Sequence, residues 1–226
     1  MRLLLIRHGQ TPANVRGEID TGPPGPGLTE LGRLQAAAVP DALASERIDG
    51  IYTSGLIRTQ QTAAPLARVR GEKHRVVLPA IHEIEAGDLE GRTDEQAIRA
   101  YVSVIWAWGD GDLSARMPGA GDGFEFYGRF DDDVARVAAE HDPDATVALF
   151  SHGAAIRVWT AARAANIPAD FPGRQHLENT GVVALEGSPS AGWIVTHWAG
   201  EPIGGRALND PQADDFVGEP LDEAAD

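Results

Sequence analysis

The 226-residue sequence contains no cysteine. This absence excludes a disulfide framework, a thiol nucleophile and a thiolate metal site, so nucleophilic chemistry falls to histidine, serine, threonine, aspartate or lysine. Lysine is almost absent as well, because Lys73 is the single lysine among 19 basic residues. A Schiff-base or P-loop mechanism would have to use Lys73, and we discount both.

Long apolar runs are also missing. The N-terminal run at residues 3–6 ends at Arg7 and His8, which is too short for a signal-peptide core or a membrane span. We therefore expect a cytoplasmic protein. The net charge of -15 is not offset by a basic stripe, which argues against nucleic acid or an anionic membrane as a partner. An anionic substrate would require arginines that are concentrated at one site.

Strand-like and helix-like segments alternate along the chain, whose length fits one α/β domain. Apolar runs typical of strands buried on both faces lie at residues 2–8, 50–54, 74–79 and 145–153. Helical stretches lie at about 29–45, 55–68, 123–141 and 153–165. This alternation predicts a mostly parallel sheet covered on both faces. The segments GVVALEG and GWIVTHWA, joined by a turn, predict a late antiparallel hairpin.

The remaining segments indicate loops and a tail. Residues 17–27 are rich in glycine and proline and predict a loop. Residues 85–122 carry two tryptophans and many glycines, and we interpret them as a partly helical, lid-like excursion inserted in a single domain at 1–200. The acidic tail at 201–226 has few apolar residues and is expected to be extended or disordered.

Two of the apolar strands end in His-Gly, at His8 and His152. Ligands of open α/β sheets bind beyond the carboxyl ends of the strands, so both histidines are expected to face one crevice. Gly9 and Gly153 would let the backbone approach a ligand closely. The pairing favours a functional site over two unrelated strand ends.

Arginines flank the same positions. Arg7 precedes His8, and Arg58 lies four residues after Ser54, which we expect to be an N-cap. A helix N-terminus, two arginines and two histidines would form an anion pocket suited to a tetrahedral phosphate.

Four ordered strings, LIRHGQTPAN, YTSGLIRTQQTA, IHEIEAGDLEG and FSHGAAIR, together with LTELGRLQA at 28–36, give the chain a strong resemblance to the histidine phosphatase (phosphoglycerate mutase-like) superfamily. The resemblance runs from residue 3 to about 198. It implies a three-layer α/β/α fold around a six-stranded mixed sheet of order 3-2-4-1-5-6, in which the fifth strand is antiparallel.

The resemblance also implies residue roles. His8 matches the phospho-accepting histidine, whose other ring nitrogen should donate to a backbone carbonyl. Arg7, Arg58 and His152 match residues that grip the phosphoryl oxygens. Glu83 matches the acid that protonates the leaving oxygen and then activates water.

Several assignments near these residues are weaker. Glu85 and His82 are rivals of Glu83, although the spacing to GDLEG favours Glu83. The residues that match substrate-contacting positions are Thr11, Asn14 and Gly153; hydroxyls and amides after a strand are often only turn formers, and a glycine serves the backbone first. Asp122 and Gly123 stand where relatives often carry Gly-Glu-Ser or Gly-Glu-Thr, which weakens any transfer of substrate by analogy.

The favoured function is a phosphatase acting on a small phosphorylated metabolite, because RHGQTPANVRG lacks the tryptophan-containing stretch usual in cofactor-dependent phosphoglycerate mutases. Such a mutase is the alternative, followed by a non-catalytic binding protein of the same fold. A metal-dependent hydrolase would draw on His74, His82 and His141, but none forms a ligand pair at helical spacing. We expect no metal and no cofactor, and the leaving group and oligomeric state stay open.

Overall fold

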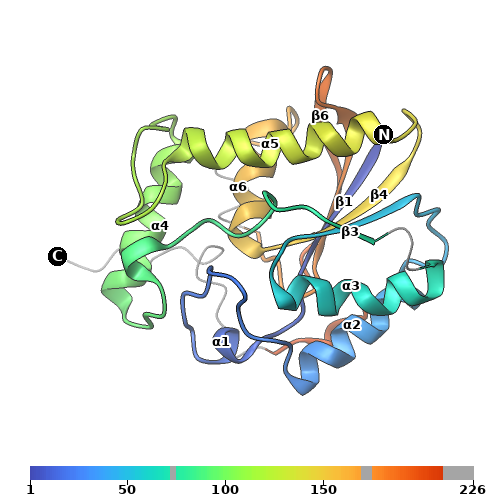
Figure 1. Cartoon of the computed structure of the whole chain (residues 1–226), viewed down its shortest axis with the longest axis horizontal. Coiled ribbons are helices and arrows are strands. Elements are labelled where there is room, and N and C mark those ends of the chain that lie inside the picture. The colour runs from blue at the N-terminus through green and yellow to red at the C-terminus, as the bar shows by residue number, and fades with distance from the viewer. Residues whose placement is uncertain (72–74, 169–174, 211–226) are drawn as a thin grey trace.

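The computed structural model describes residues 1–71, 75–168 and 175–210. Its centre is one six-stranded sheet of order β3-β2-β4-β1-β5-β6 (Figure 1). The strands are β1 (Arg2–Arg7), β2 (Gly50–Thr53), β3 (Arg75–Val77), β4 (Thr146–Ser151), β5 (Val182–Ser188) and β6 (Gly192–Ala199). The predicted strand order is confirmed, as is the fifth strand, which pairs antiparallel with both neighbours.

Helices cover both faces of this sheet. They are α1 (Pro12–Val15), α2 (Glu30–Ala42), α3 (Ile57–Arg70), α4 (Glu95–Gly109), α5 (Gly123–Glu140) and α6 (Gly153–Arg163). Figure 1 shows α2 and α3 below the sheet and α5 across its upper part, and the core packing places α5 and α6 on the face opposite α2 and α3. The predicted three-layer α/β/α class is therefore confirmed.

The alternation of β1 explains the layering. Leu3 and Leu5 belong to the core cluster shared with α4, α5 and α6, whereas Leu4 and Ile6 belong to the cluster shared with α2 and α3. Successive side chains of a strand point to opposite faces, so a continuous apolar run is needed when both faces are covered. The run at the N-terminus thus places β1 in the middle of the sheet.

The structure corrects one strand prediction. The run at 74–79 is not a strand buried on both faces, because β3 lies at the edge of the sheet and leaves Val76 42% and Val77 49% exposed. Short apolar runs do not distinguish an edge strand from a central one. His74, at the start of this run, lies outside the described residues.

The segment at 85–122 contains a 3-10 turn at Gly87–Leu89 and helix α4, which buries Tyr101, Val102 and Trp108. At the other end of the chain, a 3-10 turn at Arg206–Leu208 packs against α2, where Gln35 Nε2 donates to the Leu208 carbonyl at 2.8 Å. The part of the predicted tail beyond residue 210 lies outside the described residues. Within the described ranges, no helix is long and apolar enough to cross a membrane.

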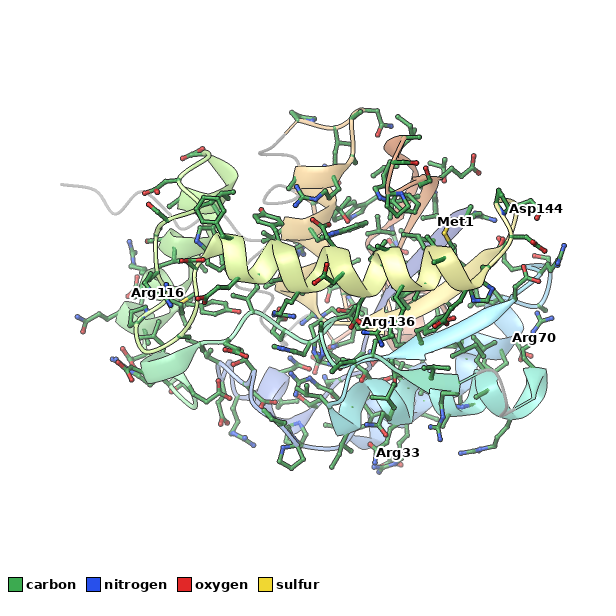
Figure 2. The ribbon with its side chains drawn as sticks, turned by 45° about the horizontal axis from the view of Figure 1, so that its top comes forward. Met1, Arg33, Arg70, Arg116, Arg136 and Asp144 are labelled. Atoms are coloured by element: carbon green, nitrogen blue, oxygen red, sulfur yellow. The ribbon has the colours of Figure 1, made fainter. Side chains whose placement is uncertain are left out.

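Basic side chains on the surface are dispersed. Figure 2 shows Arg33, Arg70 and Arg116 at separate edges of the molecule. Arg7 and Arg58, in contrast, are only 6% and 1% exposed. Both arginines therefore lie inside the molecule, Arg7 as the last residue of β1.

Candidate active site

Strand register brings the two His-Gly steps together. β1 and β4 are parallel neighbours with Arg7 opposite Ser151, and the His8 amide donates to the Ser151 carbonyl at 3.0 Å. The rings of His8 and His152 then lie 5.3 Å apart, centroid to centroid, and both residues are buried. The two histidines therefore meet at the carboxyl ends of adjacent strands, as expected, but only His8 lines the pocket there, so the expectation that both face one crevice is not confirmed.

The imidazole of His8 is held in one tautomer. Its Nδ1 lies 2.8 Å from the Gly9 carbonyl oxygen, and because a carbonyl can only accept, Nδ1 carries the proton and Nε2 has a lone pair. Burial lowers the pKa of His8 well below its ordinary value, and the charges of Arg58 and Arg7 lower it further. A neutral imidazole with an unprotonated Nε2 is the form that can attack phosphorus.

His152 lies behind this group. Its Nδ1 accepts from Arg58 Nε at 3.3 Å, because a guanidinium only donates, so its Nε2 carries the proton that is given to Ser54 Oγ at 2.8 Å. Burial lowers the pKa of His152 well below the usual range, and the positive charge of Arg58 lowers it further. His152 thereby orients the Arg58 guanidinium, and its contact with a phosphoryl oxygen stays a prediction.

The helix that carries Arg58 starts later than expected. Its N-cap is Leu56, in extended backbone and without a side-chain cap, so the expectation that Ser54 caps this helix is wrong. The chain continues through Gly55 before it turns, which frees the Ser54 hydroxyl to bind His152. Arg58 is the second residue of α3 and lines the same pocket as Arg7, which ends β1. The Nη1 atom of Arg7 donates to the Leu177 carbonyl at 2.6 Å.

Glu83 faces the N-terminus of α6. Its Oε1 accepts from the amides of Ala155 at 2.8 Å and Ile84 at 2.9 Å, and Oε2 accepts from Ala154 at 3.2 Å. These donors favour the carboxylate, but burial outweighs them and raises the pKa of Glu83. A carboxyl group with a raised pKa can hold a proton for a leaving group.

The two rivals of Glu83 lie elsewhere. The Glu85 side chain is 61% exposed, and its Oε1 is 3.8 Å from His82 Nε2. His82 Nδ1 lies 2.9 Å from the carbonyl of Glu83 and donates to it. Neither residue lines the pocket that contains His8 and Glu83. The geometry therefore favours Glu83 as the acid.

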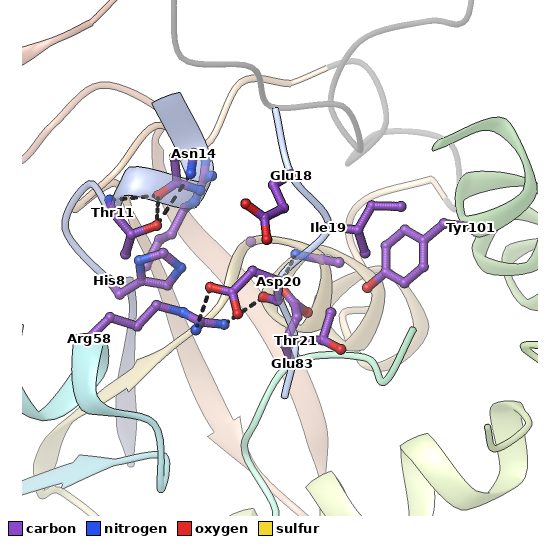
Figure 3. Close-up of a pocket in the computed structure, with 13 residues that line it drawn as sticks. His8, Thr11, Asn14, Glu18, Ile19, Asp20, Thr21, Arg58, Glu83 and Tyr101 are labelled. Carbon is purple, nitrogen blue, oxygen red and sulfur yellow. Dashed lines mark hydrogen bonds and ion pairs between the residues drawn. The ribbon is translucent and has the colours of Figure 1, made fainter. Parts of the chain in front are cut away.

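One pocket collects every predicted site residue except His152 (Figure 3). It is lined by Arg7, His8, Thr11, Asn14, Glu18, Ile19, Asp20, Thr21, Arg58, Glu83, Tyr101, Gly153 and Ala154. Two arginines, a neutral histidine and a carboxyl group with a raised pKa converge here. This combination can bind a phosphoryl group, attack it and protonate its leaving oxygen.

Thr11 and Asn14 have a structural role beside their place in the pocket. Thr11 caps α1 in a capping box, in which its hydroxyl oxygen accepts from the Asn14 amide at 3.3 Å while Asn14 Oδ1 accepts from the Thr11 amide at 3.0 Å. Asn179, which the sequence motifs did not reveal, donates from Nδ2 to the His8 carbonyl at 3.0 Å. The loop after β1 is thus fixed around the nucleophile.

The pocket also holds acidic residues that motif reasoning missed. Asp20 Oδ2 lies 3.1 Å from Arg58 Nη1, and Glu18 lines the same wall. The alternation of acidic and apolar residues in Glu18-Ile19-Asp20 could have predicted this arrangement, because in extended backbone it places both acids on one side. Tyr101 of α4 lines the far side, so part of the 85–122 segment does border the pocket.

Asp122, which departs from the pattern of relatives, and His141, considered as a metal ligand, lie outside this pocket. Asp122 caps α5 in a capping box with Glu125 and lines a different cavity, which it shares with Trp108 and Phe126. His141 bonds the Tyr52 hydroxyl through Nε2 at 2.7 Å. Among the described residues, no three metal-ligating side chains cluster.

Comparison with known proteins identifies the family. The model of the histidine phosphatase superfamily (branch 1) matches residues 3–199. The protein PE_PGRS11 of Mycobacterium tuberculosis is 36% identical over 217 residues, which cover 90% of this chain but 37% of that protein. The chain thus spans little more than a third of that relative. Glucosyl-3-phosphoglycerate phosphatase of M. tuberculosis is 30% identical over 211 residues, covering 88% of this chain and 86% of that protein.

A mycobacterial glucosyl-3-phosphoglycerate phosphatase solved with VO3 superposes with a TM-score of 0.73 at 29% identity, covering 88% of this chain and 99% of the other. The fold, the pocket and the sequence match lead to one conclusion. The chain belongs to the histidine phosphatase superfamily, branch 1.

Proposed function

We propose that the chain is a phosphomonoester hydrolase that acts on a small phosphorylated metabolite through a phosphohistidine at His8. The observation that carries the proposal is the state of His8: a buried, neutral imidazole whose Nδ1 proton is held by the Gly9 carbonyl, in a pocket with two arginines. Relatives that are phosphatases support the reaction class.

In the first step, Nε2 of His8 attacks phosphorus and the bond from phosphorus to the ester oxygen breaks. The Glu83 carboxyl gives its proton to that oxygen, so a neutral alcohol leaves. Arg7 and Arg58 stabilise the charge on the phosphoryl oxygens during transfer. The raised pKa of Glu83 and the lowered pKa of His8 both favour the reactive pair, a protonated acid and a neutral nucleophile.

In the second step, Glu83 is a carboxylate and takes a proton from water. The water oxygen attacks phosphorus, the bond to His8 Nε2 breaks, and inorganic phosphate leaves. The enzyme returns to a neutral His8 and a protonated Glu83, so the cycle balances. No step uses a metal ion, and metal independence is part of this proposal; a cytoplasmic location stays a prediction of the sequence.

The test is a phosphate-release assay on a panel of phosphorylated metabolites, with the wild type and His8→Ala. Loss of the nucleophile should lower kcat by a factor on the order of 10³ or more. Circular dichroism of His8→Ala should match the wild type. A folded His8→Ala variant that retains near wild-type activity would refute the role of His8.

A further inference from the structure

The loop that follows α1 presents two acids to the pocket. Ile19 is 1% exposed and packs in the core, and it lines the pocket together with Glu18 and Asp20 on either side of it. Figure 3 shows both carboxylates on the pocket side of this segment, Asp20 directed to Arg58 and Glu18 above it. We call Glu18 and Asp20 the acidic wall.

The acidic wall is held in place by backbone pairing. The Ile19 amide donates to the Arg92 carbonyl at 2.9 Å, and the Gly91 amide donates to the Ile19 carbonyl at 2.8 Å. Glu90 Oε1 accepts from the amides of Thr21 at 2.8 Å and Gly22 at 3.0 Å. Because the residues on both sides of Asp20 are anchored, its carboxylate is a fixed part of the pocket lining.

The charges of the pocket are therefore divided. Arg7 and Arg58 supply the positive charge that a phosphoryl dianion requires, whereas the acidic wall places negative charge beside Arg58. Glu18 is partly neutralised by Arg16, whose Nε lies 2.9 Å from Glu18 Oε2, but Arg16 is 56% exposed and lies toward solvent. The Asp20 side chain is 14% exposed, so salt screens its charge less, while its ion pair with Arg58 Nη1 at 3.1 Å offsets part of that charge.

We propose that Glu18 and Asp20 select the alcohol part of the substrate, favouring a phosphomonoester whose alcohol carries a protonated amine and disfavouring one that carries a carboxylate or a second phosphate. This inference rests on the proposed function. It assigns substrate recognition to residues that the phosphoryl chemistry itself does not use.

The physical reason is charge complementarity in a half-buried site. An ammonium group beside the acidic wall donates to carboxylates, whereas a second anion meets like charges, and such juxtaposition is costly where water is partly excluded. The arginines offer little to a second anion, because Arg7 and Arg58 bind the transferred phosphoryl group and Arg58 Nη1 also pairs with Asp20 at 3.1 Å. We therefore expect kcat/KM to be lower for an ester whose alcohol carries a second anionic group.

Three esters of similar length test the proposal: 2-aminoethyl phosphate, 2-hydroxyethyl phosphate and carboxymethyl phosphate. For the wild type at low salt, kcat/KM should fall in that order, with the amine favoured over the carboxylate by roughly tenfold or more, as expected when like charges meet at short range. Equal rates for the amine and the carboxylate, or a preference for the carboxylate, would overturn the inference.

The variants Glu18→Gln and Asp20→Asn, and their double variant, remove charge at nearly constant shape. The ratio of amine to carboxylate should fall toward unity in the double variant, and the ratio cancels any effect on Arg58 that is common to all substrates. The control is Glu95→Gln on α4. The Glu95 side chain is 74% exposed, so the variant removes one charge outside the pocket and should keep the wild-type ratio. An unchanged ratio in the double variant would refute the role of the acidic wall.

p-Nitrophenyl phosphate separates the hydrolase proposal from the acidic-wall proposal, because its alcohol carries no ionic group. If the wild type hydrolyses p-nitrophenyl phosphate and the three esters without charge preference, the result supports the proposed hydrolase and refutes the selective role of the acidic wall. If the wild type hydrolyses none of the four, the proposed function fails and the inference fails with it.

Discussion

Replacement of Glu83 by glutamine keeps the shape of the side chain and puts an amide NH2 in place of the acidic OH. Oε1 of Glu83 accepts two amide bonds, at 2.8 and 2.9 Å, and Oε2 accepts one at 3.2 Å. The amide oxygen of the introduced glutamine would keep the two bonds at the Oε1 position, which leaves its NH2 group opposite the Ala154 amide. One donor is then unsatisfied, which costs about 1–3 kcal/mol of folding stability. The variant should fold with a lowered Tm.

The kinetic effect depends on the leaving group. Glutamine cannot give a proton to an alkoxide, and loss of a general acid costs about 10²–10⁴-fold in rate. Hydrolysis of 2-hydroxyethyl phosphate should fall by this factor, whereas p-nitrophenyl phosphate should be slowed far less, because phenolate leaves without a proton. The assay is phosphate release from both substrates across a range of pH.

The pH profile gives a second readout of the same variant. The lowered pKa of His8 means that the nucleophile becomes neutral, and the rate rises, at a pH below the ordinary histidine range. The raised pKa of Glu83 means that the acid is lost, and the rate falls, at a pH above the ordinary glutamate range. The wild type should thus show a bell centred on the acidic to neutral side, and Glu83→Gln should lose the alkaline limb.

Glu85→Gln is the matched control, since it makes the same change two residues away on a side chain that is 61% exposed. It should leave the leaving-group dependence and the alkaline limb as in the wild type. If Glu83→Gln slows both substrates equally and Glu85→Gln shows the leaving-group dependence instead, the acid has been assigned to the wrong carboxylate.

Two further predictions separate neighbouring reaction classes. EDTA should leave phosphate release unchanged, while vanadate or tungstate, which mimic five-coordinate phosphorus, should inhibit; activity that is lost on chelation and restored by zinc or manganese would indicate a metal hydrolase. Incubation with 3-phosphoglycerate and a trace of 2,3-bisphosphoglycerate should yield little 2-phosphoglycerate, and rapid isomerisation without phosphate release would identify a mutase.

The sequence predicted those parts of the site that follow directly from a strand end. The apolar runs before His8 and His152 indicate two buried strands, and the strand order that the family resemblance implies places these strands side by side. The late hairpin was equally readable, because GVVALEG and GWIVTHWA are separated only by a turn. Local pattern and global fold agree in these elements.

Contacts between distant segments were not predictable in the same way. The bond from Asn179 to the His8 carbonyl joins residues 171 positions apart, and that from Ser54 to His152 joins residues 98 apart. Asp20 lies in a segment whose glycines and prolines indicate only a loop, and its approach to Arg58 depends on pairing with residues 90–92. Periodicity reports which face of an element is buried, but not which loop is folded against it.

The most direct test of the phosphohistidine mechanism is to trap the phosphorylated enzyme. Wild-type protein mixed with substrate should be denatured within one turnover at alkaline pH, where phosphohistidine survives, and its peptides analysed by mass spectrometry. We predict one phosphoryl group on the peptide that contains His8, lost on mild acid treatment and absent from His8→Ala. A phosphoryl group on another residue, or rapid turnover with no phosphorylated enzyme at any time, would contradict the mechanism.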